Sequence, residues 1–137
     1  MRSRRLLLLL AGAYALSLAL IGLWATPVDS GVAVTDLAPV AWAADLLGLS
    51  DAQVYTLTET SANVLLFVPL GALVMLFFRH WRWWHATLVA AALSVLIELA
   101  QEVWRPERFA DATDVVANTA GGAIGALIVV ASRRVRR

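Results

Sequence analysis

The stretch of sequence that decides the fold is ELAQEVWRPERFADATDVVANTAGGAIG, which runs from Glu98 to Gly125. Polar residues recur in it at spacings of three and four, and on an α-helix this spacing places them on one face. The first half predicts a helix that ends near Arg105-Pro106, because the residue before a proline disfavours helical backbone. The second half predicts another helix. Since the loop between them is short, the two helices should run antiparallel with their polar faces together.

The composition is that of a membrane protein. Hydrophobic residues make up 61% of the 137-residue chain and charged residues only 15%, whereas a soluble domain would carry more charge. We expect a single domain over residues 1–137. The basic residues are all Arg and flank apolar stretches, so no nucleic-acid-binding module is expected. The chain has no Cys, which excludes disulfides and thiolate metal sites.

Four apolar stretches are long enough to cross a bilayer as helices. They cover about residues 6–25, 61–78, 86–103 and 115–132. The first is longer than the apolar part of a signal peptide and lacks a cleavage site, so we expect it to be retained. Arg clusters lie at the N-terminus, around Arg79 and Arg82, and at the C-terminus, all on one side of the membrane. The positive-inside rule therefore predicts four spans with both termini in the cytoplasm.

Residues 26–60 carry acidic side chains and no basic ones, and they are expected outside the membrane on the far side. Within them, residues 36–49 are mildly amphipathic, with Trp42, Leu46 and Leu47 available to lie on the membrane surface. The expected fold is therefore all-α, an integral membrane four-helix bundle with an extracytoplasmic amphipathic helical segment.

The second span should belong to a longer helix. Ser50 and Gln53 form a capping-box pattern, which predicts that this helix begins near Asp51. Pro69 lies inside it and should kink the helix axis. The proline also frees a carbonyl group near Leu65, and inside a membrane a neighbouring helix must satisfy that group.

Polar side chains from three helices are expected at one depth. With a rise of 1.5 Å per residue, Asn63, Glu98 and Asn118 lie about 24, 21 and 22 Å from the cytoplasmic ends of their helices. All three positions fall in the outer third of a hydrocarbon layer about 30 Å thick. The predicted binding residues of this layer are Asn63, Glu98, Gln101, Arg105, Arg108, Asp111, Asp114 and Asn118.

Structural interpretations of several of these residues stay open. Asp111 and Asp114 suit the first turn of the last helix, where the helix dipole favours acidic groups. Asn63, Gln101 and Asn118 suit hydrogen bonds between helices. The residues expected to serve helix packing are Pro69, Gly71, Gly121 and Gly125, the last two at a Gly-x-x-x-Gly spacing.

Glu98 is harder to explain structurally. A carboxylate inside an apolar span is costly, so it is expected to face a cavity or a charged partner, and it marks a candidate functional site. Arg105 and Arg108 are the nearest expected partners, since they follow on the same face and in the adjoining loop.

Three motifs occur in order: NVLLFVPLG at 63–71, IELAQ at 97–101 and RFADATDVVANTAGGAIG at 108–125. Together they resemble the VanZ-like family, which consists of small polytopic bacterial membrane proteins. The resemblance implies a place in the bacterial plasma membrane, and the family's namesake is associated with resistance to the glycopeptide teicoplanin. The motif positions that carry over are Asn63, Phe67, Pro69, Gly71, Glu98, Gln101, Arg108, Asp111, Asp114, Asn118, Gly121 and Gly125.

Three functions stay open. The first is binding of the polar head of a cell-envelope lipid or glycopolymer intermediate in an outward-facing pocket, with Arg105 and Arg108 on phosphate and a link to teicoplanin susceptibility. The second is a structural or regulatory role in which the polar layer only locks the helices. The third is a membrane-embedded hydrolase or transferase that uses Glu98 and Asp111 or Asp114. It is the least supported, since no Ser-His pair is present. Membrane lipid is an expected partner, whereas nucleic acid, cofactors and metals are not; an oligomer stays open.

Overall fold

The computed structural model describes residues 2–22, 37–104 and 112–135, and its helices account for nearly all of them. The helices are α1 (Arg2–Gly22), α2 (Ala38–Leu47), α3 (Asp51–Phe77), α4 (Trp83–Trp104) and α5 (Ala112–Val135). The all-α class predicted from the sequence is confirmed for these residues.

Within the described residues, three helices are long and apolar enough to cross a membrane: Asp51–Phe77, Trp83–Val103 and Ala112–Val135. They contain the third and fourth of the predicted spans and all of the second except its last residue. The apolar part of α1 within the described residues, Leu8–Ile21, is shorter than these three. The expected bundle of four membrane-spanning helices therefore stays a prediction, while three helices able to span are found.

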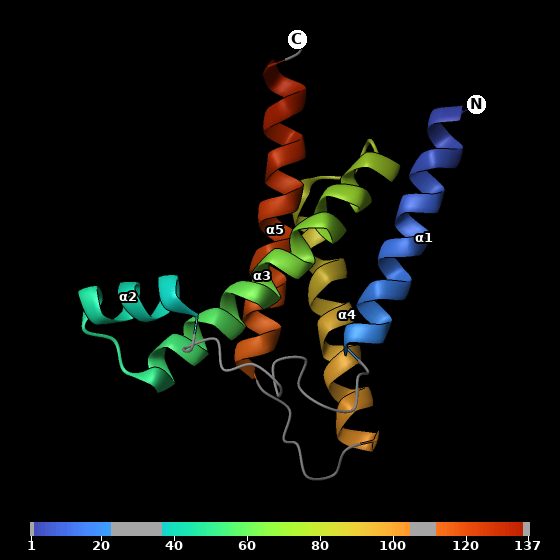
Figure 1. Cartoon of the computed structure of the whole chain (residues 1–137). Coiled ribbons are helices and arrows are strands. Elements are labelled where there is room, and N and C mark those ends of the chain that lie inside the picture. Colours follow the sequence, from blue (N-terminus) through green and yellow to red (C-terminus); the bar gives the residue numbers. More distant parts are fainter. Residues whose placement is uncertain (1, 23–36, 105–111, 136–137) are drawn as a thin grey trace.

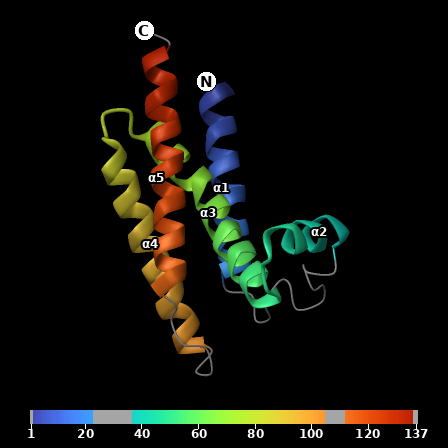
Figure 2. The same ribbon diagram turned by 90° about the vertical axis from the view of Figure 1, so that its left-hand side faces the viewer.

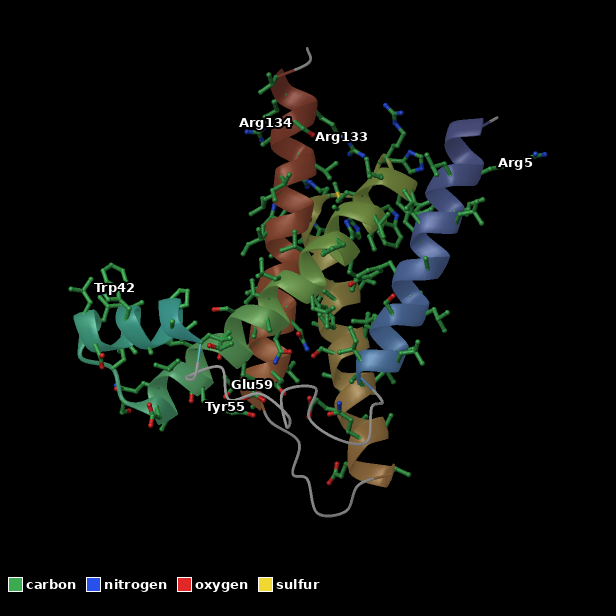
Figure 3. The ribbon with its side chains drawn as sticks, in the orientation of Figure 1. Arg5, Trp42, Tyr55, Glu59, Arg133 and Arg134 are labelled. Atoms are coloured by element: carbon green, nitrogen blue, oxygen red, sulfur yellow. The ribbon has the colours of Figure 1, made fainter. Side chains whose placement is uncertain are left out.

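The long helices are joined so that the basic ends gather together. The N-terminus, the C-terminus and the turn between α3 and α4 all lie at one end of the molecule (Figure 1). Arg5, Arg133 and Arg134 are found at this end, whereas Glu59 lies toward the opposite end (Figure 3). The helix α5 packs against both α3 and α4, and α3 crosses it at a steep inclination (Figure 1). This segregation of charge is the one that the Arg clusters indicate in the sequence.

Glycines let α5 approach α3 at backbone distance. Gly121 and Gly125 both face α3, because a Cβ atom on Gly121 would overlap the carbonyl oxygen of Val64. One on Gly125 would overlap that of Val68. From α3, Gly71 meets the backbone of α5 in the same way. Close approach of this kind is how helices associate in lipid, where dispersion contacts replace the hydrophobic effect.

Phe67 is the centre of the inner apolar cluster. Its side chain is only 1% exposed, and it packs with Leu18 from α1 and Ala90 from α4. A second cluster nearer the basic end is formed by Met75, Ala86, Ala126 and Val129. Large side chains from α3 thus fill the space between helices whose contacting residues are mostly small.

The proline in α3 lies where α1 docks. Pro69 has no N–H to donate, so the carbonyl of Leu65 loses its helical partner and the hydrogen-bond ladder is disturbed around it. The hydroxyl of Tyr14 on α1 donates to the carbonyl oxygen of Leu66 at 2.7 Å. A neighbouring helix therefore supplies a donor at this disturbed turn, one residue beyond the carbonyl expected from the sequence.

Removing this hydroxyl is expected to weaken the docking of α1. Tyr14→Phe keeps the ring that packs against the cluster of Leu18, Phe67 and Ala90 but deletes the donor. An interhelical hydrogen bond in a membrane protein contributes about 1 kcal/mol, so the unfolding temperature in detergent should fall by a few degrees. The control is Ser17→Ala on the same helix, since the Ser17 hydroxyl bonds only to its own helix at Ala13. Equal unfolding temperatures for the two variants would show that the Tyr14 bond does not hold α1.

The predicted start of α3 is confirmed. Ser50 is the N-cap residue, and its hydroxyl accepts a hydrogen bond from the backbone N–H of Gln53. In return, the Gln53 side chain accepts from the Ser50 backbone N–H at 2.9 Å. Just before it, Gly48 ends α2 in a left-handed conformation with φ of 64°, which reverses the chain direction between the two helices.

The opposite end of α3 is capped by a residue far away in the sequence. The guanidinium of Arg133 donates to the carbonyl oxygens of Met75 and Arg79. The Met75 carbonyl lies in the last turn of α3, where helical partners are missing and the dipole favours a cation, and the Arg79 carbonyl lies in the turn that follows. Arg133 therefore ties the end of α5 to the end of α3, in addition to being part of the basic cluster.

Candidate functional site

Hydrogen bonds between side chains of the described residues join α3, α4 and α5 in the polar layer. Asn63 on α3 donates through Nδ2 to Oδ1 of Asp114 on α5, at 2.6 Å. Asn118, one turn further along α5, donates through Nδ2 to Oγ of Ser94 on α4, at 2.9 Å. The antiparallel course of α4 and α5 thus brings residues from both together at one level, as Figure 2 lets the reader follow.

Asn118 is buried with half of its amide unused. The residue is 6% exposed, and among the described residues its Oδ1 atom has no hydrogen-bond partner. Among the described residues the amide is given one hydrogen bond, to Ser94, so turning it over would exchange which end makes that bond. A buried polar atom left in this state costs about 1–3 kcal/mol. Such atoms are rare in folded proteins and call for an explanation.

Glu98 and Ser94 are one turn apart on α4. Ser94 is fully buried and Glu98 is 8% exposed. Both therefore lie on the inner side of a helix that is mostly apolar and long enough to span a membrane. Because Ser94 bonds to Asn118, the inner side of α4 at this level faces α5. A carboxyl group in these surroundings is as costly as the sequence suggests.

Asp114 occupies a position with two uses. It lies in the first turn of α5, where the helix dipole stabilises a carboxylate, and it accepts the hydrogen bond from Asn63. Gln101 is half-buried on α4. The remaining predicted binding residues, Arg105, Arg108 and Asp111, lie outside the described residues.

Ser94 is the residue of this layer that sequence reasoning missed. Its hydroxyl carries no charge and is easily read as one more small residue in the run of Ala and Leu that surrounds it. The signal was its spacing of four before Glu98, which places both on one helix face. Glu59 precedes Asn63 by the same spacing of four on α3. It lies toward the end of the molecule opposite Arg133 and Arg134 (Figure 3).

The chemistry available to the described part of the layer is mainly hydrogen-bond acceptance. The unused amide oxygen of Asn118 can accept from a hydroxyl or an amine, and carboxyl groups stand in the same layer. No group of three or more His, Cys, Asp or Glu side chains able to hold a metal ion occurs in the ranges that the structure describes.

Comparisons with known proteins place the chain in a family. The family model described as VanZ/LLP1 matches residues 7–133. Neither the curated proteins nor the solved structures give a match. The match covers α1 as well as the region whose motifs resemble the family, and three of the helices are able to cross a membrane. The chain is a membrane protein that belongs to the VanZ/LLP1 family.

Proposed function

We propose that this protein lies in the bacterial plasma membrane with both termini in the cytoplasm. In this proposal it binds the polar head of a cell-envelope lipid or glycopolymer intermediate. The binding site is the polar layer of Asn63, Glu98, Asp114 and Asn118, which opens toward the outer surface. Gln101, Arg105, Arg108 and Asp111 belong to the proposed site as well, with the two arginines on phosphate. An effect on glycopeptide susceptibility would follow if the ligand is an intermediate of cell-wall assembly.

The observation that carries the proposal is the unpaired Oδ1 atom of Asn118. A layer that served only to lock helices together would be expected to satisfy its own buried groups. Here one acceptor stays open beside Ser94, at a level where Glu98 is also buried. A hydroxyl or amine of a sugar, glycerol or ethanolamine head group would donate to this oxygen and remove the cost of leaving it unpaired.

The test is a thermal shift of the purified protein in detergent, with and without a bacterial total lipid extract in the same detergent. The parent should be stabilised by the lipid. Glu98→Gln and Asn118→Leu should fold but bind about ten- to one-hundred-fold more weakly, which is the loss of one hydrogen bond to a charged or buried group. Asn118→Leu should fold because the Ser94 hydroxyl can turn to a carbonyl of its own helix.

The control is Thr87→Val on α4, which removes a hydroxyl bonded to its own helix at Trp83, close to the α3–α4 turn. It should keep the full lipid shift. Folded Glu98→Gln and Asn118→Leu variants that also keep the parent's shift would exclude this layer as the binding site.

A second candidate function is favoured by the two interhelical hydrogen bonds, Asn63 to Asp114 and Asn118 to Ser94. These are the contacts of a layer that locks helices together. In that case the lipid should raise the unfolding temperature of the parent no more than it raises that of the variants. Glu98→Gln should then be neutral or stabilising, because it removes a charge that is expensive to bury and keeps the size of the side chain.

A further inference from the structure

The helix α2 stands apart from the rest of the molecule. It projects sideways from the end opposite the two termini and runs across the direction of α5 (Figures 1 and 2). None of its residues is buried. Large apolar side chains are instead left open on it, since Trp42 is 68% exposed and Leu46 and Leu47 are each 69% exposed. A soluble protein would not leave these side chains in water on so short a helix.

Two of the open side chains share a face. Trp42 and Leu46 are four residues apart, so they lie one above the other on the helix surface, whereas Leu47 lies about 100° further round the helix. The chain reversal at Gly48 folds α2 back beside the first turns of α3. Its half-buried residues Val40 and Ala44 lie on the side of the helix away from Trp42, and Leu47 is nearer to them than to Trp42. The face that carries Trp42 and Leu46 is thus left uncovered.

The spanning helices show what this face points toward. A membrane around the apolar lengths of α4 and α5 would have its normal roughly along α5, so α2 lies across that normal. Trp42 stands on the side of α2 that faces the end carrying Arg133 and Arg134 (Figure 3). Because α2 lies near the opposite end of the spanning helices, a side chain that points toward the basic end points into the hydrocarbon layer.

We propose that α2 lies in the membrane–water interface at the end opposite the basic clusters, with Trp42 and Leu46 in contact with lipid. Trp is the residue enriched at this depth, because its ring is apolar and its N–H stays near water. Residues 26–60 contain no Lys or Arg, so attraction to anionic lipid does not hold the segment down. Apolar contact does, and a zwitterionic bilayer is sufficient. This inference does not depend on what the polar layer binds.

The test places a spin label at single introduced cysteines, which is clean because the chain has none. Leu46→Cys keeps Trp42 in place. Two positions calibrate the measurement. Leu65→Cys lies within the span of α3 at a residue that is 70% exposed, and Asp51→Cys lies at the exposed start of α3. Each variant is reconstituted in phosphatidylcholine vesicles, and collisions of the label with oxygen and with a water-soluble nickel complex are measured.

The ratio of oxygen to nickel collisions at residue 46 should be several-fold above that at Asp51→Cys and below that at Leu65→Cys. It should not change when anionic lipid or salt is added. Adding Trp42→Asp to Leu46→Cys should lower the ratio toward the Asp51→Cys value. A ratio equal to that of Asp51→Cys would place α2 in water and overturn the proposal. So would labels that neither reagent reaches and whose spin–spin broadening disappears on dilution with unlabelled protein, since the face would then be covered by a second copy.

Discussion

Replacing Gly125 by leucine should prevent α3 and α5 from packing, and we expect this to be among the most damaging single substitutions in the chain. A Cβ atom at this position already overlaps the carbonyl oxygen of Val68 and lies 2.9 Å from the backbone nitrogen of Ala72. Backbone atoms cannot turn aside as a side chain can, so the two helices must separate. Overpacking in well-filled cores costs about 1–3 kcal/mol, and a clash with backbone should reach or exceed the upper end of that range.

The measurement is the yield of monodisperse protein in detergent and its unfolding temperature. Gly12→Leu is the matched control, because it adds the same side chain to a helix at a position where a Cβ would meet nothing within 4 Å. It should behave like the parent or gain slightly, since leucine forms helix more readily than glycine. If Gly125→Leu unfolds at the parent's temperature, the close contact between α3 and α5 is not present in the folded protein.

The second large effect is expected for Phe67→Ala. Phe67 joins three helices, because it packs with Leu18 of α1 and Ala90 of α4 and its Cβ lies next to Gly121 of α5. Truncating a buried phenylalanine in a soluble core costs about 3–5 kcal/mol. Part of that cost is transfer from water, which does not arise when the surroundings are lipid. We therefore expect a loss of about 2–3 kcal/mol, mostly from the cavity and its lost dispersion contacts.

The control for Phe67→Ala lies two residues away on the same helix. Leu65 is 70% exposed, so truncating it exchanges contacts with lipid or detergent and leaves no cavity. Leu65→Ala should change the unfolding temperature little. Comparable losses for the two variants, measured by reversible unfolding in mixed micelles, would mean that Phe67 is not at the centre of the packing.

The features that could be predicted from the sequence are those set by short-range spacing. The start of α3 depends on Ser50 and Gln53, which are three residues apart, and it is found where the pattern predicts it. The apolar stretches are helical because of their length and because leaving backbone groups unpaired in lipid is costly in free energy. The gathering of Arg5, Arg133 and Arg134 at one end likewise follows from counting helices between them.

The first span stays a prediction. Residues 6–25 are long enough to cross a bilayer, and the structure describes α1 over Arg2–Gly22 but not residues 23–25. One residue of the candidate site could not be picked out from the sequence. Ser94 carries no charge that would set it apart in a run of small residues, and only its contact with Asn118 reveals it.

By itself, the amino-acid sequence determined that this chain is helical, that it belongs in a membrane, where α3 begins and which helix faces carry the polar groups. These properties depend on residues within one or two turns of each other and on the cost of polar groups in hydrocarbon. Which polar groups pair was decided by the tertiary structure alone: Asn63 with Asp114, Asn118 with Ser94, and Tyr14 with the backbone of Leu66. Such pairs depend on how far each helix is rotated and inclined. Those angles are set by the closest backbone contacts, here at Gly71, Gly121 and Gly125, which no local pattern specifies.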